Sequence, residues 1–208
     1  MDVCSTETPK SQGPKGERGH LIRTCFRTSR LLDFTSEKEL TAQTGHEKKD
    51  WPLVALKELL DNALDACEET GVPPVISVKV DDTGITVADN GPGIPPDTLD
   101  GILDFTVRAS SREAYISPTR GAQGNALKVV LAMPFVLDGD HGRVDIAGRG
   151  QRQEITFAVD RIRQQPTITR QVHPDGIVKI GTKFTLHWPN SALLDADRGQ
   201  IAFFTTRR

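Results

Sequence analysis

The chain has 208 residues, is 37% hydrophobic and 26% charged, and carries a formal net charge of -2 at pH 7. These values are typical of an ordinary soluble globular protein that is long enough to build a real core. No apolar run approaches the roughly 20 residues that a membrane span needs, and Cys4, Cys25 and Cys67 are too scattered for a disulfide framework or a zinc site. We therefore expect a cytoplasmic protein without a membrane partner.

The two ends of the chain differ in composition from its middle. Residues 1–20 are polar, contain no apolar centre of a signal peptide, and predict a disordered leader. Residues 21–190 are expected to form one domain, and residues 191–208 a tail that is a short helix or a frayed end. Between Leu21 and His46, short apolar groups alternate with charge, which favours a strap or a short helix on the domain surface.

A helix is predicted around Leu53 to Cys67, with Asp50 as its N-cap, Pro52 in its first turn and Gly71 as its stop. Its apolar residues recur at steps of three and four and predict a stripe that docks on a sheet. These residues are Leu53, Leu56, Leu60, Ala63, Leu64 and Cys67.

The same helix carries three polar residues, Glu58, Asn62 and Asp65, at separations of four and three. Such spacings place all three side chains on one face. Alone, the trio is ambiguous, because an amphipathic helix with these residues on its wet face is more often structural than catalytic.

A β-hairpin is predicted next, from Val75 to Asp81 and from Ile85 to Ala88, with a turn at residues 82–84. Its second strand runs into Asp89 and then into a loop whose Gly91 and Gly93 allow backbone to approach a flat ligand closely. Asp89 would offer that ligand a hydrogen-bond acceptor. A tight loop that binds nothing is the alternative.

A short helix is expected from Asp97 to Phe105 and a mobile loop from Thr106 to Arg120, which is either a solvated basic connection or a lid over an anion. Glycines at Gly121 and Gly124 then open a helix, a geometry in which free N–H groups hold phosphate. The remainder predicts strands at Phe135–Leu137, Arg143–Ala147, Gln153–Val159, Thr167–Arg170 and Thr182–His187, with Gly139, Gly142, Gly148 and Gly150 at turns.

The order of these motifs resembles that of the GHKL superfamily, whose Bergerat-fold nucleotide site is shared by type II DNA topoisomerases, MutL-type repair proteins, cytosolic chaperones and sensor histidine kinases. The motifs are E-x-x-x-N-x-x-D-A on a helix, D-x-G-x-G after a strand, G-x-x-G-x-A at a helix start and G-T on a late strand. The resemblance implies an α+β fold: a two-layer α/β sandwich with a mixed, largely antiparallel sheet covered by helices on one face.

Roles follow from the resemblance, position by position. Glu58 is similar to the general base that activates water, Asn62 to the Mg²⁺ ligand, and Asp65 to a supporting residue. Asp89 matches the adenine-recognising aspartate, and Thr182 the hydroxyl that shares a water with it. Gly93 matches the close backbone approach to the base, and Gly121 and Gly124 match the phosphate loop. The remaining implied nucleotide contacts are Gly91, Ile94, Ser110, Ser111, Gln123, Asn125 and Ala126.

Within the superfamily, the residues after Glu58 and around Gly121 most resemble those of the B subunit of topoisomerase VI. The sequence Gly124–Leu127 is similar to the corresponding motif of the MutL branch. The resemblance implies a slow Mg-dependent ATPase that drives conformational change in DNA processing, with a DNA-cleaving or transducer partner and a nucleotide-dependent dimer. Ala126 departs from the topoisomerase pattern, and we expect these residues to lack the lysine that a transducer domain supplies to the γ-phosphate in the family. A non-hydrolytic regulatory ATP-binding module, or a histidine-kinase-like protein, is the alternative, although Lys57 stands where many kinases carry histidine.

Overall fold

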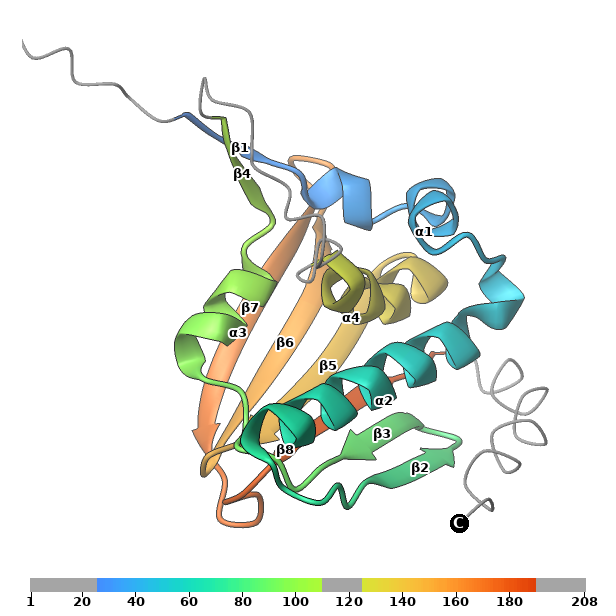
Figure 1. Ribbon diagram of the computed structural model, residues 1–208. Helices are drawn as coiled ribbons and strands as arrows, with labels where there is room; N and C mark the ends of the chain where they lie inside the picture. The colour runs from blue at the N-terminus through green and yellow to red at the C-terminus, as the bar shows by residue number, and fades with distance from the viewer. Residues whose placement is uncertain (1–25, 110–124, 190–208) are drawn as a thin grey trace, which may run out of the picture.

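The computed structural model describes residues 26–109 and 125–189 (Figure 1). The predictions for the leader and the tail lie outside these residues. The elements in chain order are β1 (Phe26–Ser29), the 3-10 turn η1 (Leu31–Phe34), α1 (Glu37–Thr44), the 3-10 turn η2 (Lys48–Asp50), α2 (Trp51–Thr70), β2 (Ser77–Asp81), β3 (Gly84–Ala88), α3 (Pro96–Leu103), β4 (Thr106–Ala109), α4 (Asn125–Asp138), β5 (His141–Gly148), β6 (Gln151–Asp160), β7 (Gln165–Pro174) and β8 (Thr182–His187).

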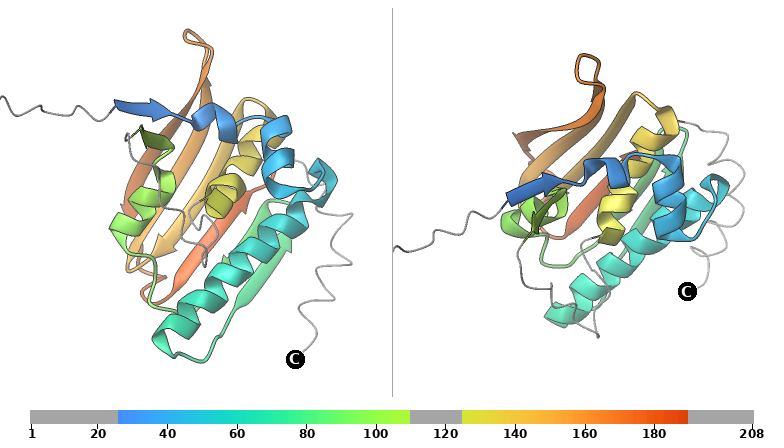
Figure 2. Two further views of the ribbon diagram at one scale, coloured as in Figure 1. Left: turned by 45° about the horizontal axis from the view of Figure 1, so that its top comes forward. Right: turned by 90° about the horizontal axis from the view of Figure 1, so that it is seen from above.

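Six strands form one open sheet in the order β2-β3-β8-β5-β6-β7, and each neighbouring pair is antiparallel. Figure 2 shows α1, α2, α3 and α4 together on one face of this sheet. The predicted α+β sandwich of two layers is therefore confirmed, with a sheet that is antiparallel throughout its described pairs rather than mixed. β1 and β4 pair separately as a two-stranded sheet.

The core lies between the sheet and the helices because strand residues alternate between the two faces. Val144, Ile146, Ile155, Phe157 and Leu186 point inward and are at most 3% exposed. From α2, the buried residues include Trp51 and Leu59. Leu64, which the predicted stripe included, is instead 39% exposed, since it lies off the face of α2 that meets the sheet.

The strand predicted at Phe135–Leu137 is wrong, because these residues continue α4 to Asp138. Pro134 lies inside this helix, where it lacks the N–H that the helical hydrogen-bond ladder uses. Burial offsets that loss: the residues from Val129 to Phe135 are all buried, so this part of α4 is apolar around its circumference. A helix of this kind has no amphipathic pattern that would distinguish it from a short strand.

The first four residues of the predicted loop at Thr106–Arg120 also differ from expectation, since they form β4 and pair with β1. The described part of the segment predicted as a strap or short helix contains β1, η1 and α1, and Leu40 of α1 is fully buried.

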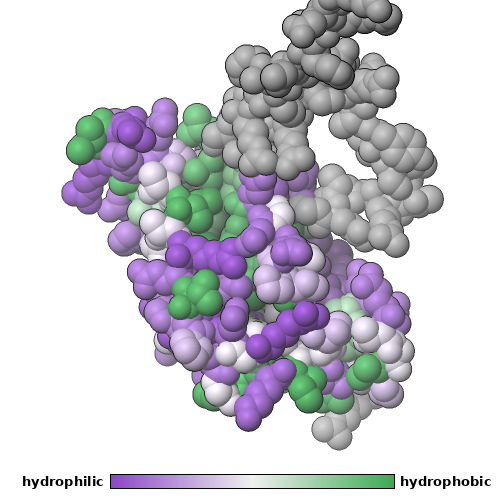
Figure 3. Space-filling view, turned by 90° about the vertical axis from the view of Figure 1, so that its left-hand side faces the viewer, coloured by the Kyte–Doolittle hydropathy of each residue, from purple (hydrophilic) through white to green (hydrophobic). Residues whose placement is uncertain are grey.

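In the part of the chain that the structure describes, no helix is long and apolar enough to cross a membrane. Figure 3 shows the side of the molecule that carries α3 and β7, where hydrophobic residues form small groups among hydrophilic ones.

Gly142, predicted at a turn, lies instead within β5, where the strand passes close to α4. A Cβ at this position would lie 2.4 Å from the backbone nitrogen of Phe135. We expect Gly142→Ala to lower the free energy of unfolding by ~1–3 kcal/mol, because two packed backbones must separate. Urea unfolding measures the loss.

The control for this variant is Gly101→Ala in α3, where a Cβ would meet no atom within 4 Å. Alanine favours a helix over glycine, so this substitution should leave stability unchanged or raise it by up to about 1 kcal/mol. Equal effects of the two substitutions would contradict a close contact between β5 and α4 at Gly142.

Candidate functional site

α2 supplies the polar face that the sequence predicted. Pro52 lies in its first turn, and Gly71 ends it in the left-handed conformation with φ 67°. Asp50 occupies the N-cap position, but its side chain makes no capping hydrogen bond, because η2 already holds its backbone in a helical conformation. Glu58 and Asn62 are half-buried on this helix, whereas Asp65 is exposed.

The Glu58 carboxylate is held by its neighbour on the helix. Lys57 Nζ lies 3.1 Å from Glu58 Oε1 and 2.6 Å from Asp61 Oδ2. Hydrogen bonds to Asp61 and then to Glu58 raise the pKa of Lys57, so the ammonium stays charged. Because the Glu58 side chain is only 26% exposed against 65% for Lys57, the pair forms at the edge of the protein surface.

The orientation of Asn62 follows from one hydrogen bond: Nδ2 donates to the Glu58 carbonyl at 2.7 Å. A carbonyl accepts only from the amide nitrogen, so Oδ1 of Asn62 points away from the helix backbone. This oxygen suits a hard divalent cation. Among the described residues no group of three or more His, Cys, Asp and Glu could hold a metal.

Asp89 joins the end of β3 to the start of β8. Its Oδ1 accepts hydrogen bonds from the backbone N–H of Gly91 at 2.8 Å and of Thr182 at 3.1 Å. Thr182 is buried, and Gly181 before it has φ 81°. A Cβ on Gly181 would lie 1.8 Å from the Asp89 carbonyl oxygen, so only glycine fits there. One carboxylate oxygen is thus fixed, and the other has no partner among the described residues.

Asn90, which the sequence reasoning did not single out, fastens this loop to the end of α2. Its Oδ1 accepts from Val75 N at 2.8 Å and from Cys67 Sγ at 3.4 Å, and its Nδ2 donates to the Pro73 carbonyl at 3.0 Å. The loop therefore stays close to the helix.

Gly91 lies against α2, since a Cβ there would be 3.3 Å from that of Ala66. Glu58 and Ala66 are eight residues apart, which is about 12 Å along a helix. The Asp89 loop therefore lies against the C-terminal part of α2, and Asn62 and Glu58 lie about one and two turns closer to the N-terminus of the helix.

A cavity of about 260 Å³ opens where α1, α2 and α4 meet. It brings Glu58 together with Asn125 and Ala126, the first residues of α4, whose contact with a nucleotide stays a prediction. Its other lining residues are Gln43, Thr44, His46, Val54, Lys57, Val129 and Val130.

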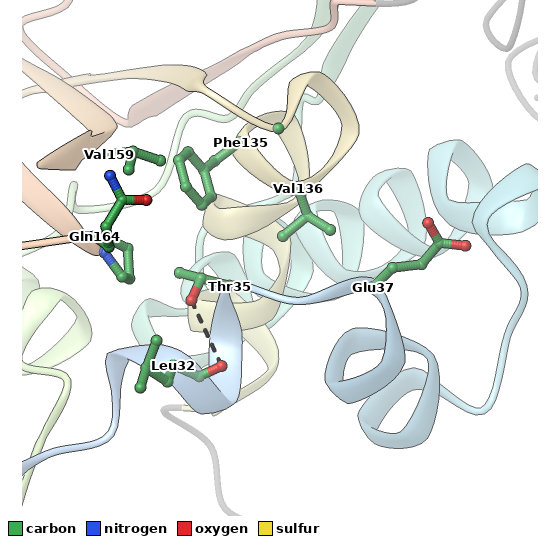
Figure 4. Close-up of a pocket in the computed structure, with 9 residues that line it drawn as sticks. Leu32, Thr35, Glu37, Phe135, Val136, Val159 and Gln164 are labelled. Atoms are coloured by element: carbon green, nitrogen blue, oxygen red, sulfur yellow. Dashed lines mark hydrogen bonds between the residues drawn. The ribbon is translucent and has the colours of Figure 1, made fainter. Parts of the chain in front are cut away.

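A second cavity, of about 270 Å³, lies at the opposite end of α4 (Figure 4). Leu32, Phe135 and Val159 give it an apolar lining. Glu37 is its one acidic lining residue and pairs with Lys48 at 3.4 Å. This cavity offers none of the predicted site residues, so size does not identify the functional site here.

The remaining predicted residues divide into two groups. Gly93 is buried with φ 75°, and Ile94 beside it packs against the core. The other group lies outside the described residues: Ser110, Ser111, Gly121, Gln123 and Gly124.

Curated proteins resemble the chain over part of their length. The B subunit of type 2 DNA topoisomerase 6 from Archaeoglobus fulgidus is 31% identical over 140 residues, which are 64% of the chain and 23% of that protein. The protein of the same name from Thermococcus gammatolerans is 27% identical over 165 residues, or 76% of the chain and 29% of that protein. The chain thus spans less than a third of the length of either relative.

A solved structure of the 43K ATPase domain of Thermus thermophilus gyrase B, in complex with an aminocoumarin, is 22% identical to the chain with a TM-score of 0.39. The similarity covers 77% of this chain and 36% of that one.

A family model described as "Histidine kinase-, DNA gyrase B-, and HSP90-like ATPase" matches residues 48–192. This range contains α2, the Asp89 loop, α4 and β8, the elements that carry the described site residues. Since it covers more than half of the 208 residues, the chain belongs to the histidine kinase-, DNA gyrase B- and HSP90-like ATPase family.

Proposed function

We propose that this chain is a Mg-dependent ATP-binding domain that hydrolyses ATP slowly. The observation that carries the proposal is the Asp89 carboxylate, whose Oδ1 is fixed by the amides of Gly91 and Thr182. Its second oxygen remains available to a ligand at the end of the sheet. A fixed acceptor between buried glycines suits the exocyclic amine of adenine, because a flat base needs both close backbone approach and one directional partner.

The phosphate end lies toward the N-terminal half of α2. Here the cavity holds the Glu58 carboxylate beside the start of α4, where the N–H groups of a first helical turn and the helix dipole favour an anion. Asn62 Oδ1 is the protein oxygen that fits Mg²⁺. When bound, this ion would neutralise charge that develops on the phosphates.

In hydrolysis, Glu58 would accept a proton from water as the water oxygen bonds to the terminal phosphorus, the bond from that phosphorus to the bridging oxygen breaks, and ADP leaves. The carboxylate acts as a general base and stays in place because Lys57 holds Oε1 at 3.1 Å. Asp65 is exposed and, in this proposal, supports the polar face without contacting the reacting atoms.

The alternative is a regulatory module that binds ATP without hydrolysing it. Its specific support is the ion pair between Lys57 and Glu58, since Lys57 Nζ occupies Glu58 Oε1, one of the two carboxylate oxygens that could otherwise contact the attacking water. Turnover by the wild-type chain distinguishes the two functions.

The wider role is also a proposal. The two relatives described above are named as the B subunit of type 2 DNA topoisomerase 6, and the chain spans 23% and 29% of them. We propose that ATP binding drives a conformational change in a DNA-processing assembly, topoisomerase VI-like or MutL-like, with dimerisation and a partner that supplies a cation to the terminal phosphate.

Calorimetry with a non-hydrolysable ATP analogue tests the proposal. We expect binding in Mg²⁺, and replacement of Mg²⁺ by EDTA should weaken it by about tenfold or more, equivalent to ~1.4 kcal/mol. Adenosine, which has no phosphates for Mg²⁺ to bridge, serves as the control and should bind equally in both buffers. No binding of the analogue in Mg²⁺ would refute the proposed function.

A further inference from the structure

Arg149 has a backbone conformation that is unfavourable for its residue type. It lies in the turn between β5 and β6 with φ 53°, and Gly150 follows with φ 76°. Two consecutive positive φ values suit a tight hairpin turn, but asparagine, aspartate or glycine normally occupies the first position. Within residues 26–109 and 125–189, the one other non-glycine residue with positive φ is Gln164. Strain of this kind persists where surrounding contacts impose it, and it often marks a functional position.

The Arg149 side chain reaches the loop that follows Asp89. Its Nε lies 3.2 Å from the carbonyl oxygen of Pro92 and 3.2 Å from that of Gly93, so one N–H is shared between two backbone acceptors. A Cβ on Gly93 would lie 3.0 Å from Arg149 Cγ and 2.9 Å from the Gly181 carbonyl oxygen. Gly93 is therefore enclosed between the arginine stem and the start of β8.

The turn that carries Arg149 is itself fixed. Gly150 N donates to the Val178 carbonyl at 2.9 Å, and Asp175 N donates to the Gly150 carbonyl at 2.8 Å. On the other side, Gly148 pairs with Thr182, whose N–H donates to Asp89. No carboxylate of the described residues pairs with Arg149, so its guanidinium is directed to the two loop carbonyls rather than to a salt bridge.

We propose that Arg149 is a positioning residue for nucleotide binding, which holds the Pro92–Gly93 backbone in place from the β5–β6 turn. The inference rests on the proposed function, since it assigns this loop to the adenine end of the site. A loop that is ordered before the ligand arrives loses less conformational entropy on binding, so removing the guanidinium should weaken affinity. The loss of affinity should be the same for ATP and ADP, because the hydrogen bonds of Arg149 support the loop at the base and not at the terminal phosphate.

Arg149→Gly separates this role from a purely structural one. Glycine adopts φ 53° without strain. The substitution therefore removes the hydrogen bonds from Arg149 Nε to the loop and, at the same time, the backbone strain of the turn. We expect the affinities for the non-hydrolysable ATP analogue and for ADP to fall by the same factor, about fivefold or more, equivalent to ~1 kcal/mol. The melting temperature should stay unchanged or rise.

Gln164→Gly is the matched control. Gln164 has the same φ of 53°, but it lies in the turn between β6 and β7 and lines the cavity at the far end of α4 (Figure 4). This variant should also keep or raise the melting temperature, with unchanged affinity for both nucleotides. Arg149→Lys keeps the charge but not the planar donor group, and should lie between wild type and Arg149→Gly in affinity.

Calorimetry and thermal unfolding of the wild type and the three variants complete the test. Unchanged affinity in Arg149→Gly would overturn the inference, and so would a parallel loss of affinity and melting temperature. If the wild-type chain bound neither nucleotide, the proposed function itself would fail, and this inference with it.

Discussion

Glu58→Gln is expected to lower the rate of ATP turnover by about 10²–10⁴-fold, while the affinity for ATP stays within a few-fold of wild type. Glutamine keeps the size of the side chain but cannot accept a proton from water. A general base acts in the transition state more than in the ground state, so turnover is lost and binding is kept. Phosphate release at saturating ATP and calorimetry with the non-hydrolysable analogue measure the two quantities.

Asp61→Asn is the control for this variant. Asp61 lies on the same helix and shares Lys57 with Glu58, since its Oδ2 is 2.6 Å from Lys57 Nζ. It lies one turn away on the exposed side of α2, so turnover should change by no more than about twofold, a surface ion pair being worth ~0–1 kcal/mol. Turnover that survives in Glu58→Gln would remove Glu58 from the reaction. Wild-type turnover no faster than that of Glu58→Gln would favour the non-hydrolytic module.

Local signals in the sequence predicted α2 and the β2–β3 hairpin. The stop at Gly71 and the turn before β3 depend on residues next to them in the chain, so the structure matches expectation within a few positions. The spacing of Glu58 and Asn62 likewise places them on one side of α2 without any tertiary information.

Features set by distant contacts could not be predicted in this way. The acceptors of Arg149 Nε lie 57 and 56 positions earlier in the chain, and a Gly-Arg-Gly sequence indicates a turn without indicating where the side chain goes. The sequence around Gly142 predicts a turn, and the need for glycine there follows only from the packing of β5 against α4. The prediction for the C-terminal end of α4 was wrong for another reason. The apolar residues there are buried on all sides of the helix, so the sequence shows no helical period.

Asp89→Asn should weaken the binding of both ATP and ADP by about 100-fold, near the upper end of the ~1–3 kcal/mol that an unsatisfied buried polar group costs. The asparagine oxygen can still accept from Gly91 and Thr182, so the junction of β3 and β8 should remain. The second oxygen becomes an NH₂ group, and two donors then face each other where the adenine amine approaches. Calorimetry with both nucleotides measures the loss.

Asp160→Asn controls for the loss of a turn carboxylate. Asp160 Oδ1 also accepts from two backbone amides, those of Ile162 at 2.9 Å and Arg163 at 3.1 Å, but it lies at the turn between β6 and β7 and affinity should not change. Inosine triphosphate gives the sharper comparison, because it carries an oxygen where ATP carries the amine. The NH₂ group that Asp89→Asn introduces can donate to that oxygen, so the preference for ATP over inosine triphosphate should fall or reverse. An unchanged preference would mean that Asp89 organises the loop without contacting the base.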